Sequence, residues 1–149
     1  MSENLTQNDN ATNLTAKGFC MTSAVWMMMA TLVGLTAAIE LVAPDLAGNI
    51  AWLLFSRLRP MHVNLVLFGF VTPGLLGSVF YLFPRLLRTQ PYSEKLGVLT
   101  VVAWNIVLVA VVITLGMGIT QGREYAEMIW PTDVAVVAAF LLIFVTLIM

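Results

Sequence analysis

The stretch "SRLRPMHVNLVLFGF", residues 56–70, joins two arginines, a proline and the chain's single histidine to a long apolar run. No Asp, Glu, Lys or Arg occurs from His62 to Phe83. A helix that crosses a bilayer needs about 20 predominantly apolar residues, and this run is long enough. The stretch therefore predicts a membrane-spanning helix that begins at His62, with the arginines in the polar region just before it.

The composition of the whole chain agrees with a membrane protein. Hydrophobic residues make up 60% of the 149 residues and charged residues only 10%. A soluble domain needs more charge to cover its surface, so we expect membrane lipid as the surroundings. The formal net charge is −1, and no basic face is present that could neutralise phosphates. A nucleic acid is therefore excluded as a partner.

Four runs without charged residues predict four helices, because lipid leaves no backbone polar group unsatisfied and the runs are too long for barrel strands. They are residues 18–39, 62–83, 96–122 and 134–149. The last run has 16 residues, fewer than a span needs, so we expect a fourth helix that is cut short. The predicted fold class is an all-α integral membrane bundle of four transmembrane helices.

The first 17 residues differ from the rest. "MSENLTQNDNATNLTAK" is rich in Asn and Thr and has too few apolar side chains to pack. Such composition is typical of disorder, so we expect a disordered tail over 1–17 and one transmembrane domain over 18–149.

The positive residues suggest an orientation. They fall in two groups, one on each side of the predicted helices: Lys17, Arg85, Arg88 and Lys95 on one, and Arg57, Arg59 and Arg123 on the other. The second group is interspersed with acidic residues, whereas the short loop of the first has only Glu94. Because cytoplasmic loops carry excess Lys and Arg, we expect both termini in the cytoplasm and His62 at the outer end of its helix.

His62 has two interpretations. An ionisable side chain at the edge of the hydrocarbon layer needs a partner and often marks function. Imidazole is an axial ligand of haem iron, and arginines near the water interface would suit the anionic haem propionates. The alternative is an interfacial histidine bonded to a carbonyl or water, with Arg57 and Arg59 merely reaching toward water.

Glycines and amide side chains also lie inside the predicted spans, and the glycines have two interpretations. Gly69, Gly74 and Gly77 could leave space for a flat ring, or could let helices pack closely. The amides of Asn64 and Asn105 would each bond to a neighbouring helix.

A second polar stretch, "GREYAEMIWP" at residues 122–131, lies on the same side as His62. Glu124 and Glu127 could bind a hard cation through their carboxylates or pair with the arginines. The alternative is a polar turn in which Tyr125 and Trp130 belong to the interfacial aromatic belt and Pro131 opens the fourth helix.

The two stretches together, "SRLRPMHVNLVLFGF" and "GREYAEMIWPTDV", closely resemble the N-terminal part of subunit I of cbb3-type cytochrome c oxidases. These are C-family haem-copper oxidases of the bacterial cytoplasmic membrane and relatives of the bacterial nitric oxide reductases. The resemblance covers the chain from its first predicted helix to its end. It implies the first third of a twelve-helix bundle, acting in respiratory electron transfer with other oxidase polypeptides, including cytochrome c-type subunits.

The resemblance also implies roles for individual residues. His62 matches the ligand of the low-spin haem b, and Arg59 matches an arginine that contacts haem propionates, with Arg57 supporting it. Glu124 matches a glutamate that binds a calcium ion between the propionates of two haems. One departure is "LFPRLL" after the second helix, where the family more often has a Gln-Arg pair.

The larger departure is the single histidine. A bis-histidine haem needs a second imidazole and a copper centre needs several, so no oxygen-reducing centre exists in these residues. We expect no catalytic residue here; copper and the high-spin haem would belong to the complete subunit. The alternatives are a small stand-alone b-type cytochrome, in which two copies of His62 hold one haem, and a remnant without a cofactor.

Overall fold

The computed structural model describes the backbone of residues 2–47, 50–89, 93–123 and 126–148, and side chains from residue 14 onward except 46 and 47. Within these residues all regular structure is helical. Four helices are long and apolar enough to cross a membrane, which confirms the predicted fold class.

The four spans follow one another in the chain. The first is Leu14–Val42, within the longer helix α1 (Ser2–Val42). The second, Phe55–Leu87, comprises α2 (Phe55–Asn64), a π-helical segment η3 (Leu65–Val71) and α3 (Thr72–Leu87). The third is α4 (Glu94–Gly116) and the fourth α5 (Trp130–Ile148). Two short 3₁₀ turns, η1 (Pro44–Ala47) and η2 (Ala51–Leu53), connect α1 to α2.

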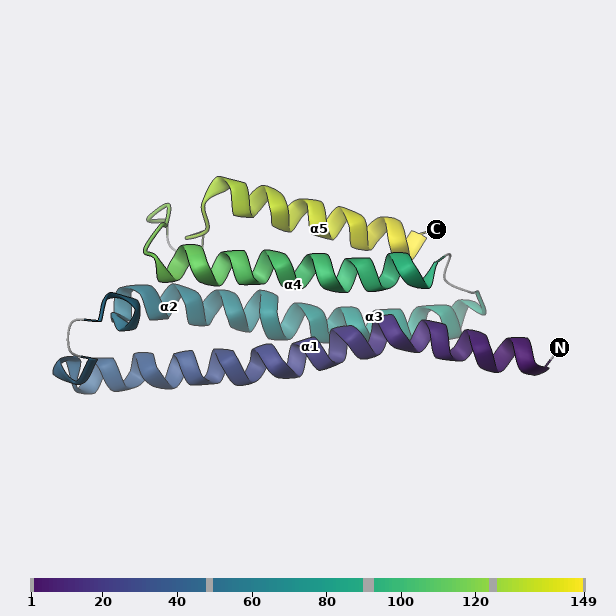
Figure 1. Ribbon diagram of the computed structural model, residues 1–149, viewed down its shortest axis with the longest axis horizontal. Coiled ribbons are helices and arrows are strands. Elements are labelled where there is room, and N and C mark those ends of the chain that lie inside the picture. Colours follow the sequence, from purple (N-terminus) through teal and green to yellow (C-terminus); the bar gives the residue numbers. More distant parts are fainter. Residues whose placement is uncertain (1, 48–49, 90–92, 124–125, 149) are drawn as a thin grey trace.

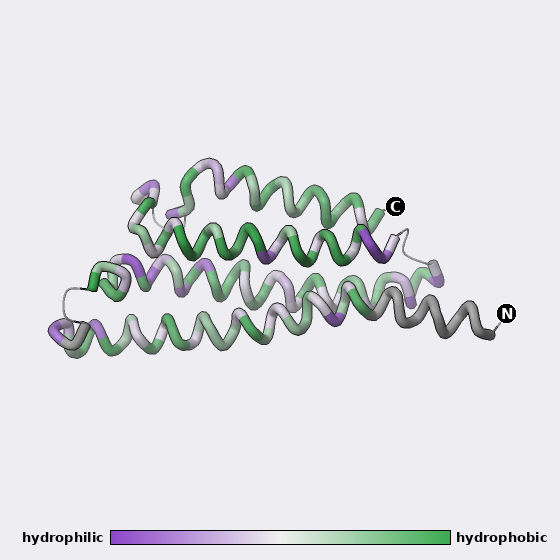
Figure 2. The backbone as a smooth tube through the Cα atoms, in the orientation of Figure 1, coloured by the Kyte–Doolittle hydropathy of each residue, from purple (hydrophilic) through white to green (hydrophobic). Residues whose placement is uncertain are grey.

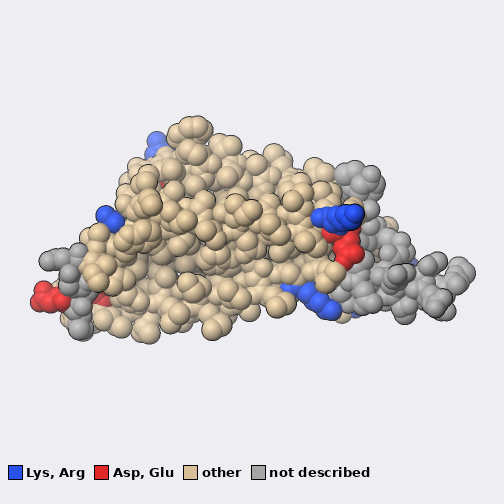
Figure 3. Space-filling model, in the orientation of Figure 1, with Lys and Arg blue, Asp and Glu red and all other residues tan. Residues whose placement is uncertain are grey.

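The spans lie side by side (Figure 1). α1 packs along α2, η3 and α3. α4 packs on α2, η3 and α1, and α5 packs on α4. Both ends of the chain lie at the same end of the bundle (Figure 1). Apolar residues predominate in the middle of each helix (Figure 2), and the visible charged side chains gather toward the two ends (Figure 3). The largest fully buried side chains include Trp104, Phe19 and Leu65.

The second span begins earlier than predicted. The helix starts at Phe55 and not at His62, so both arginines and the histidine lie on one helix. The prediction was wrong here because it took the arginines as the end of the span. A long cationic side chain can remain in a helix at the interface while its charge reaches a partner or water.

The third and fourth spans also differ from their predicted limits. α4 ends at Gly116, six residues before the predicted Gly122, because Gly118 adopts a left-handed conformation with φ +77°. α5 begins at Trp130, because Pro131 suits a first helical turn and Asp133 lies in that turn. With 19 residues it is long enough to cross a membrane, and the predicted start at Val134 was four residues too late.

The polar segment predicted as a disordered tail has helical backbone, because α1 includes residues 2–17. Its last residues contact the bundle: Thr15 and Ala16 are buried, and Thr15 lies against Gly97 of α4. Packing of Thr15 and Ala16 against the bundle offsets the entropy of ordering these two residues. The division into a disordered tail over 1–17 and a transmembrane domain over 18–149 stays a prediction.

The glycines of the second span serve helix packing. Gly69 lies against Trp26, Gly74 against Ser23, and the sulfur of Cys20 would be 2.6 Å from a Cβ on Gly77. All three partners are on α1. The close-packing interpretation of these glycines is therefore confirmed, and none of them faces His62.

The two intramembrane amides behave differently. Asn105 on α4 accepts a hydrogen bond from Trp26 Nε1 at 2.9 Å and so joins α4 to α1, as predicted. Asn64 donates to the carbonyl of Pro60 at 2.8 Å, within its own helix. The expectation of an interhelical bond was wrong for Asn64.

Candidate functional site

His62 lies on the third turn of α2 and is half-buried against α1. Its Nδ1 is 2.8 Å from the backbone oxygen of Ala30. A carbonyl oxygen only accepts hydrogen bonds, so Nδ1 must carry the proton and donate it. In the neutral ring, Nε2 then holds the free lone pair and can accept a bond from a metal or a donor.

A glycine lies opposite the imidazole. A Cβ on Gly34 of α1 would be 2.6 Å from His62 Cε1 and 2.7 Å from Nδ1, so any larger residue would displace the ring. Gly34 was not among the residues singled out from the sequence. No local signal in α1 marks it, because its importance comes from the helix that packs against it.

Beside the imidazole runs a groove of about 390 Å³ between α1 and α2. Small or short side chains form much of its α1 wall, and His62 and Arg59 form part of its α2 wall. The lining residues are Thr31, Gly34, Ala37, Ala38, Leu41, Phe55, Arg59 and His62. The groove therefore combines an imidazole and a cation with largely apolar walls.

The two arginines of α2 have different surroundings. Arg59 is exposed and lines the groove together with His62. Arg57, two residues earlier, points to another helix and donates from Nη1 to the carbonyl of Gly116 at 2.9 Å. Because residues two apart on a helix point in nearly opposite directions, the two guanidiniums do not share one task.

Arg59 also lines a second hollow of about 390 Å³ between α2 and the loop that follows α4. One wall is formed by Phe55, Ser56, Arg59 and Pro60, and the other by Thr120, Gly122, Arg123 and Glu127. Arg123 brings a second cation to this hollow. The sequence indicated Arg123 only as one of the positive residues on the outer side. Its nearness to Arg59 could not be predicted, because the two residues are far apart in the sequence.

The loop around this hollow is held by its own hydrogen bonds. Gln121 donates to the carbonyl of Met128 and, at 3.0 Å, to Asp133 of α5. Glu124 and Tyr125 lie outside the described residues, so the predicted calcium ligand has no described position. Among the described residues, no group of three or more His, Cys, Asp or Glu could hold a metal ion by itself.

The π-helical segment η3 begins three residues after His62 and is held by donors from two neighbouring helices. Trp104 of α4 donates to the carbonyl of Phe68 at 2.9 Å, and Ser23 of α1 donates to that of Phe70 at 2.7 Å. π-helical turns are rare and often occur at functional sites. Both α1 and α4 thus fix the helix that carries the histidine.

Residues 15–149 match the family described as cytochrome c and quinol oxidase polypeptide I. The chain belongs to this oxidase family. The match begins beside Leu14, where the first span begins, and runs through all four spans of the chain.

The curated relatives of this chain include a cbb3-type protein. The chain is 33% identical over 118 residues to the cbb3-type cytochrome c oxidase subunit CcoN1 of Stutzerimonas stutzeri. The aligned region covers 79% of this chain and 25% of that relative. The chain is 36% identical over 114 residues to a cytochrome c oxidase subunit 1 homolog of Agrobacterium tumefaciens, covering 76% and 21%. The predicted resemblance to subunit I of cbb3-type oxidases is confirmed. The chain spans between a fifth and a quarter of the length of these relatives.

Proposed function

We propose that the chain supplies, through His62, one axial ligand of the low-spin haem b in a cbb3-type cytochrome c oxidase subunit I, in respiratory electron transfer to oxygen. The support is the relationship to cbb3-type subunits together with the surroundings of His62. When bound, the haem supplies reversible one-electron chemistry.

The observation that carries the proposal is the bond between His62 Nδ1 and the carbonyl of Ala30. Histidines that ligate metals usually donate their other ring N–H to a carbonyl or carboxylate, which fixes the tautomer and the ring plane. Here that bond leaves the lone pair on Nε2 for iron. The same bond would also satisfy an interfacial histidine, and it is the open groove beside the ring, which such a histidine would not need, that favours the ligand role.

The residues around the groove fit a haem. Gly34, Ala37 and Ala38 keep side-chain volume away from the histidine, which suits a flat macrocycle. Arg59 lines the same groove, and arginine binds carboxylates such as propionates with a permanently charged, planar group. Its part is to hold the polar edge of the haem where the helix meets water.

The chain alone has one imidazole. A second axial histidine and the ligands of copper and of a high-spin haem would come from outside these 149 residues. We therefore propose that the chain works in a complex with the remaining oxidase polypeptides, including cytochrome c-type subunits, and that no oxygen is reduced on its own residues.

We also propose a calcium ion held by Glu124 against the haem propionates. The support is chemical: propionates bring negative charge that one arginine cannot offset, and carboxylate oxygens suit calcium. Replacing Glu124 by Gln should lower the calcium content of the complex while leaving its haem content unchanged. Metal analysis that finds equal calcium in both proteins would remove Glu124 from the proposal.

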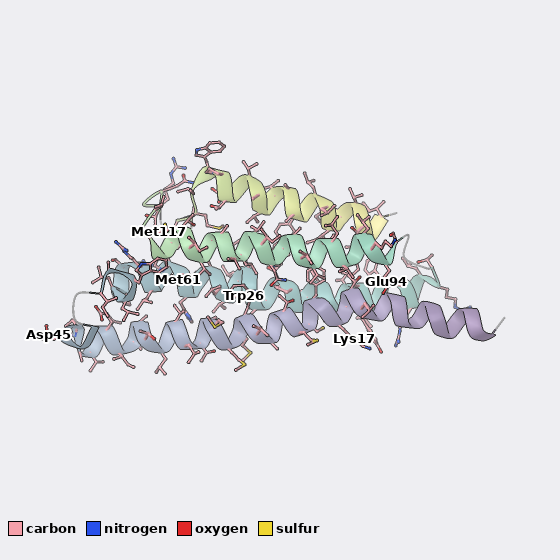
Figure 4. All side chains as sticks on the ribbon, in the orientation of Figure 1. Lys17, Trp26, Asp45, Met61, Glu94 and Met117 are labelled. Atoms are coloured by element: carbon pink, nitrogen blue, oxygen red, sulfur yellow. The ribbon has the colours of Figure 1, made fainter. Side chains whose placement is uncertain are left out.

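The proposed location is the bacterial cytoplasmic membrane, with both termini in the cytoplasm. Both termini lie at one end of the bundle, and Lys17 and Glu94 lie toward that end, whereas Met61 and Met117 lie toward the other (Figure 4). Four Lys and Arg residues belong to the proposed cytoplasmic end and three to the outer end, as positive loops prefer the cytoplasm.

The test of the haem proposal is His62→Ala in membranes that contain the assembled complex. We expect the low-spin b-type absorption to disappear, while Arg85→Ala at the opposite end leaves it unchanged. An unchanged spectrum in His62→Ala would contradict the ligand assignment. One haem bound per two copies of the chain, without any other polypeptide, would instead favour the small stand-alone cytochrome.

A further inference from the structure

The end of α4 is closed by a well-defined hydrogen-bond pattern. The amide of Ile119 donates to the carbonyl of Thr114 and that of Gly118 to Leu115, both at 2.9 Å. With Gly118 left-handed, this is a Schellman motif, which satisfies carbonyls that a helix end would otherwise leave open. It does not use the carbonyl of Gly116, the last residue of the helix.

Arg57 occupies that position. Its Nη1 donates to Gly116 O at 2.9 Å, and a Cβ on Gly118 would lie 3.1 Å from both Cζ and Nε of its guanidinium. The C-terminal end of a helix carries partial negative charge, which favours a cation there. The ring of Trp52, which lies in η2, also packs against Gly116. Trp52 and Arg57 therefore both contact the C-terminal end of α4.

The bond between Arg57 and Gly116 lies next to the hollow that Arg59 lines. Ser56, Arg59 and Pro60 of α2 form one wall, and Thr120, Gly122 and Arg123 of the loop after α4 form the other. Arg57 lies between these α2 residues in sequence and bonds to the residue where that loop departs. This bond therefore joins the two walls of the hollow at their shared end.

We propose that Arg57 is a positioning residue that ties the start of the α4–α5 loop to α2, and so sets Arg123 and Glu127 against Arg59 and the haem edge. Its action on haem rests on the proposed function. The contact between α2 and α4 does not, because both of its groups, the Arg57 guanidinium and the Gly116 carbonyl, belong to this chain. Arg57 supports Arg59 through the backbone and makes no contact of its own with a propionate.

The test measures the distance between the two walls directly. Spin labels at Ser56→Cys and Thr120→Cys, in a Cys20→Ser background, report the width of the hollow by pulsed electron resonance in the assembled complex. We expect a narrow distance distribution with Arg57, and one about twofold broader with Arg57→Gln, because a loop that loses a tether samples more conformations. Arg57→Lys keeps the charge, so it should assemble and give an intermediate width. Arg85→Gln, at the opposite end, should change nothing.

Haem content and spectrum, measured on the same samples, separate this proposal from the haem proposal. Low-spin haem is expected to remain in Arg57→Gln, since His62 is intact. Loss of haem with an unchanged distance distribution would show that Arg57 contacts the cofactor, which overturns the positioning role and leaves the haem proposal standing. If the complex with Arg57 intact carries no low-spin haem b, a broader distribution in Arg57→Gln still supports the tether, and only the haem proposal is refuted. Arg57→Gln could fail to assemble, and Arg57→Lys then provides the test. A label-to-label distance distribution in Arg57→Lys as narrow as that with Arg57 would overturn the proposal that Arg57 tethers the loop.

Discussion

The two ends of the bundle carry similar arginines that do different things. At the His62 end, Arg57 reaches from α2 to the carbonyl of Gly116 on α4, and Arg59 lines two hollows between elements. At the opposite end, Arg85 bonds to Tyr81 one turn earlier in its own helix, with its guanidinium 3.9 Å from the centre of the tyrosine ring. Arg88 there adopts φ 51° at the end of α3.

The difference lies in whether an arginine contacts a second helix or only its own. Exposed pairs within one helix contribute little to stability and fix nothing between elements. An arginine that reaches another helix constrains the space between the two. Matched changes at positions that do and do not join two elements should therefore differ in their effect.

The largest effect is expected for Gly34→Ala. The added Cβ would meet the His62 ring at 2.6 Å, while the ring is held by its bond to Ala30. Overpacking of this kind costs about 1–3 kcal/mol, and the displaced imidazole should lose its low-spin haem signal. Optical spectra and the resistance of the complex to denaturing detergent measure both consequences.

The control for Gly34 is Gly18→Ala, also on α1. A Cβ there would lie 3.3 Å from two methyl carbons of Val101, which can adjust, and alanine favours a helix over glycine by about 1 kcal/mol. Gly18→Ala should therefore leave the spectrum and the stability nearly unchanged. Equal haem content in both variants would mean that Gly34 is not part of the site.

A smaller effect is expected for Arg59→Leu. Loss of a charge-assisted hydrogen bond to a carboxylate weakens binding by about tenfold, so haem should dissociate faster while the low-spin form persists in what remains bound. Haem transfer to an acceptor protein measures the rate. Arg85→Leu should not change it, and a similar rate in the two variants would remove the distinction between the two ends.

The smallest effect concerns the donors around η3. Ser23→Ala removes a bond from α1 to the carbonyl of Phe70, and interhelical bonds in membranes contribute about 0.6 kcal/mol on average. Ser78→Ala removes only a bond to Gly74 within the same helix and should cost less. Detergent unfolding curves of the two variants provide the comparison, and a larger loss for Ser78→Ala would show that η3 is not held by α1.

Much of the fold could be predicted because lipid imposes simple rules. Charge-free runs had to be helices, and the positions of charged residues indicated the ends of the bundle. The errors occurred where charge was taken as a boundary: α2 includes Arg57 and Arg59, and α5 includes Asp133. Cationic and acidic side chains near a helix end do not stop the helix, since its backbone is satisfied internally.

The sequence by itself determined that the protein is a bundle of membrane helices with one imidazole near two arginines. The tertiary structure alone decided that Gly34 lies opposite His62, that Arg57 and Arg59 have separate partners, and that Arg123 shares a hollow with Arg59. The physical reason is that a membrane helix is apolar on every side. Its hydrophobic pattern therefore does not tell which face meets lipid and which meets another helix, and only the packing of small residues and the hydrogen bonds between helices fix that choice.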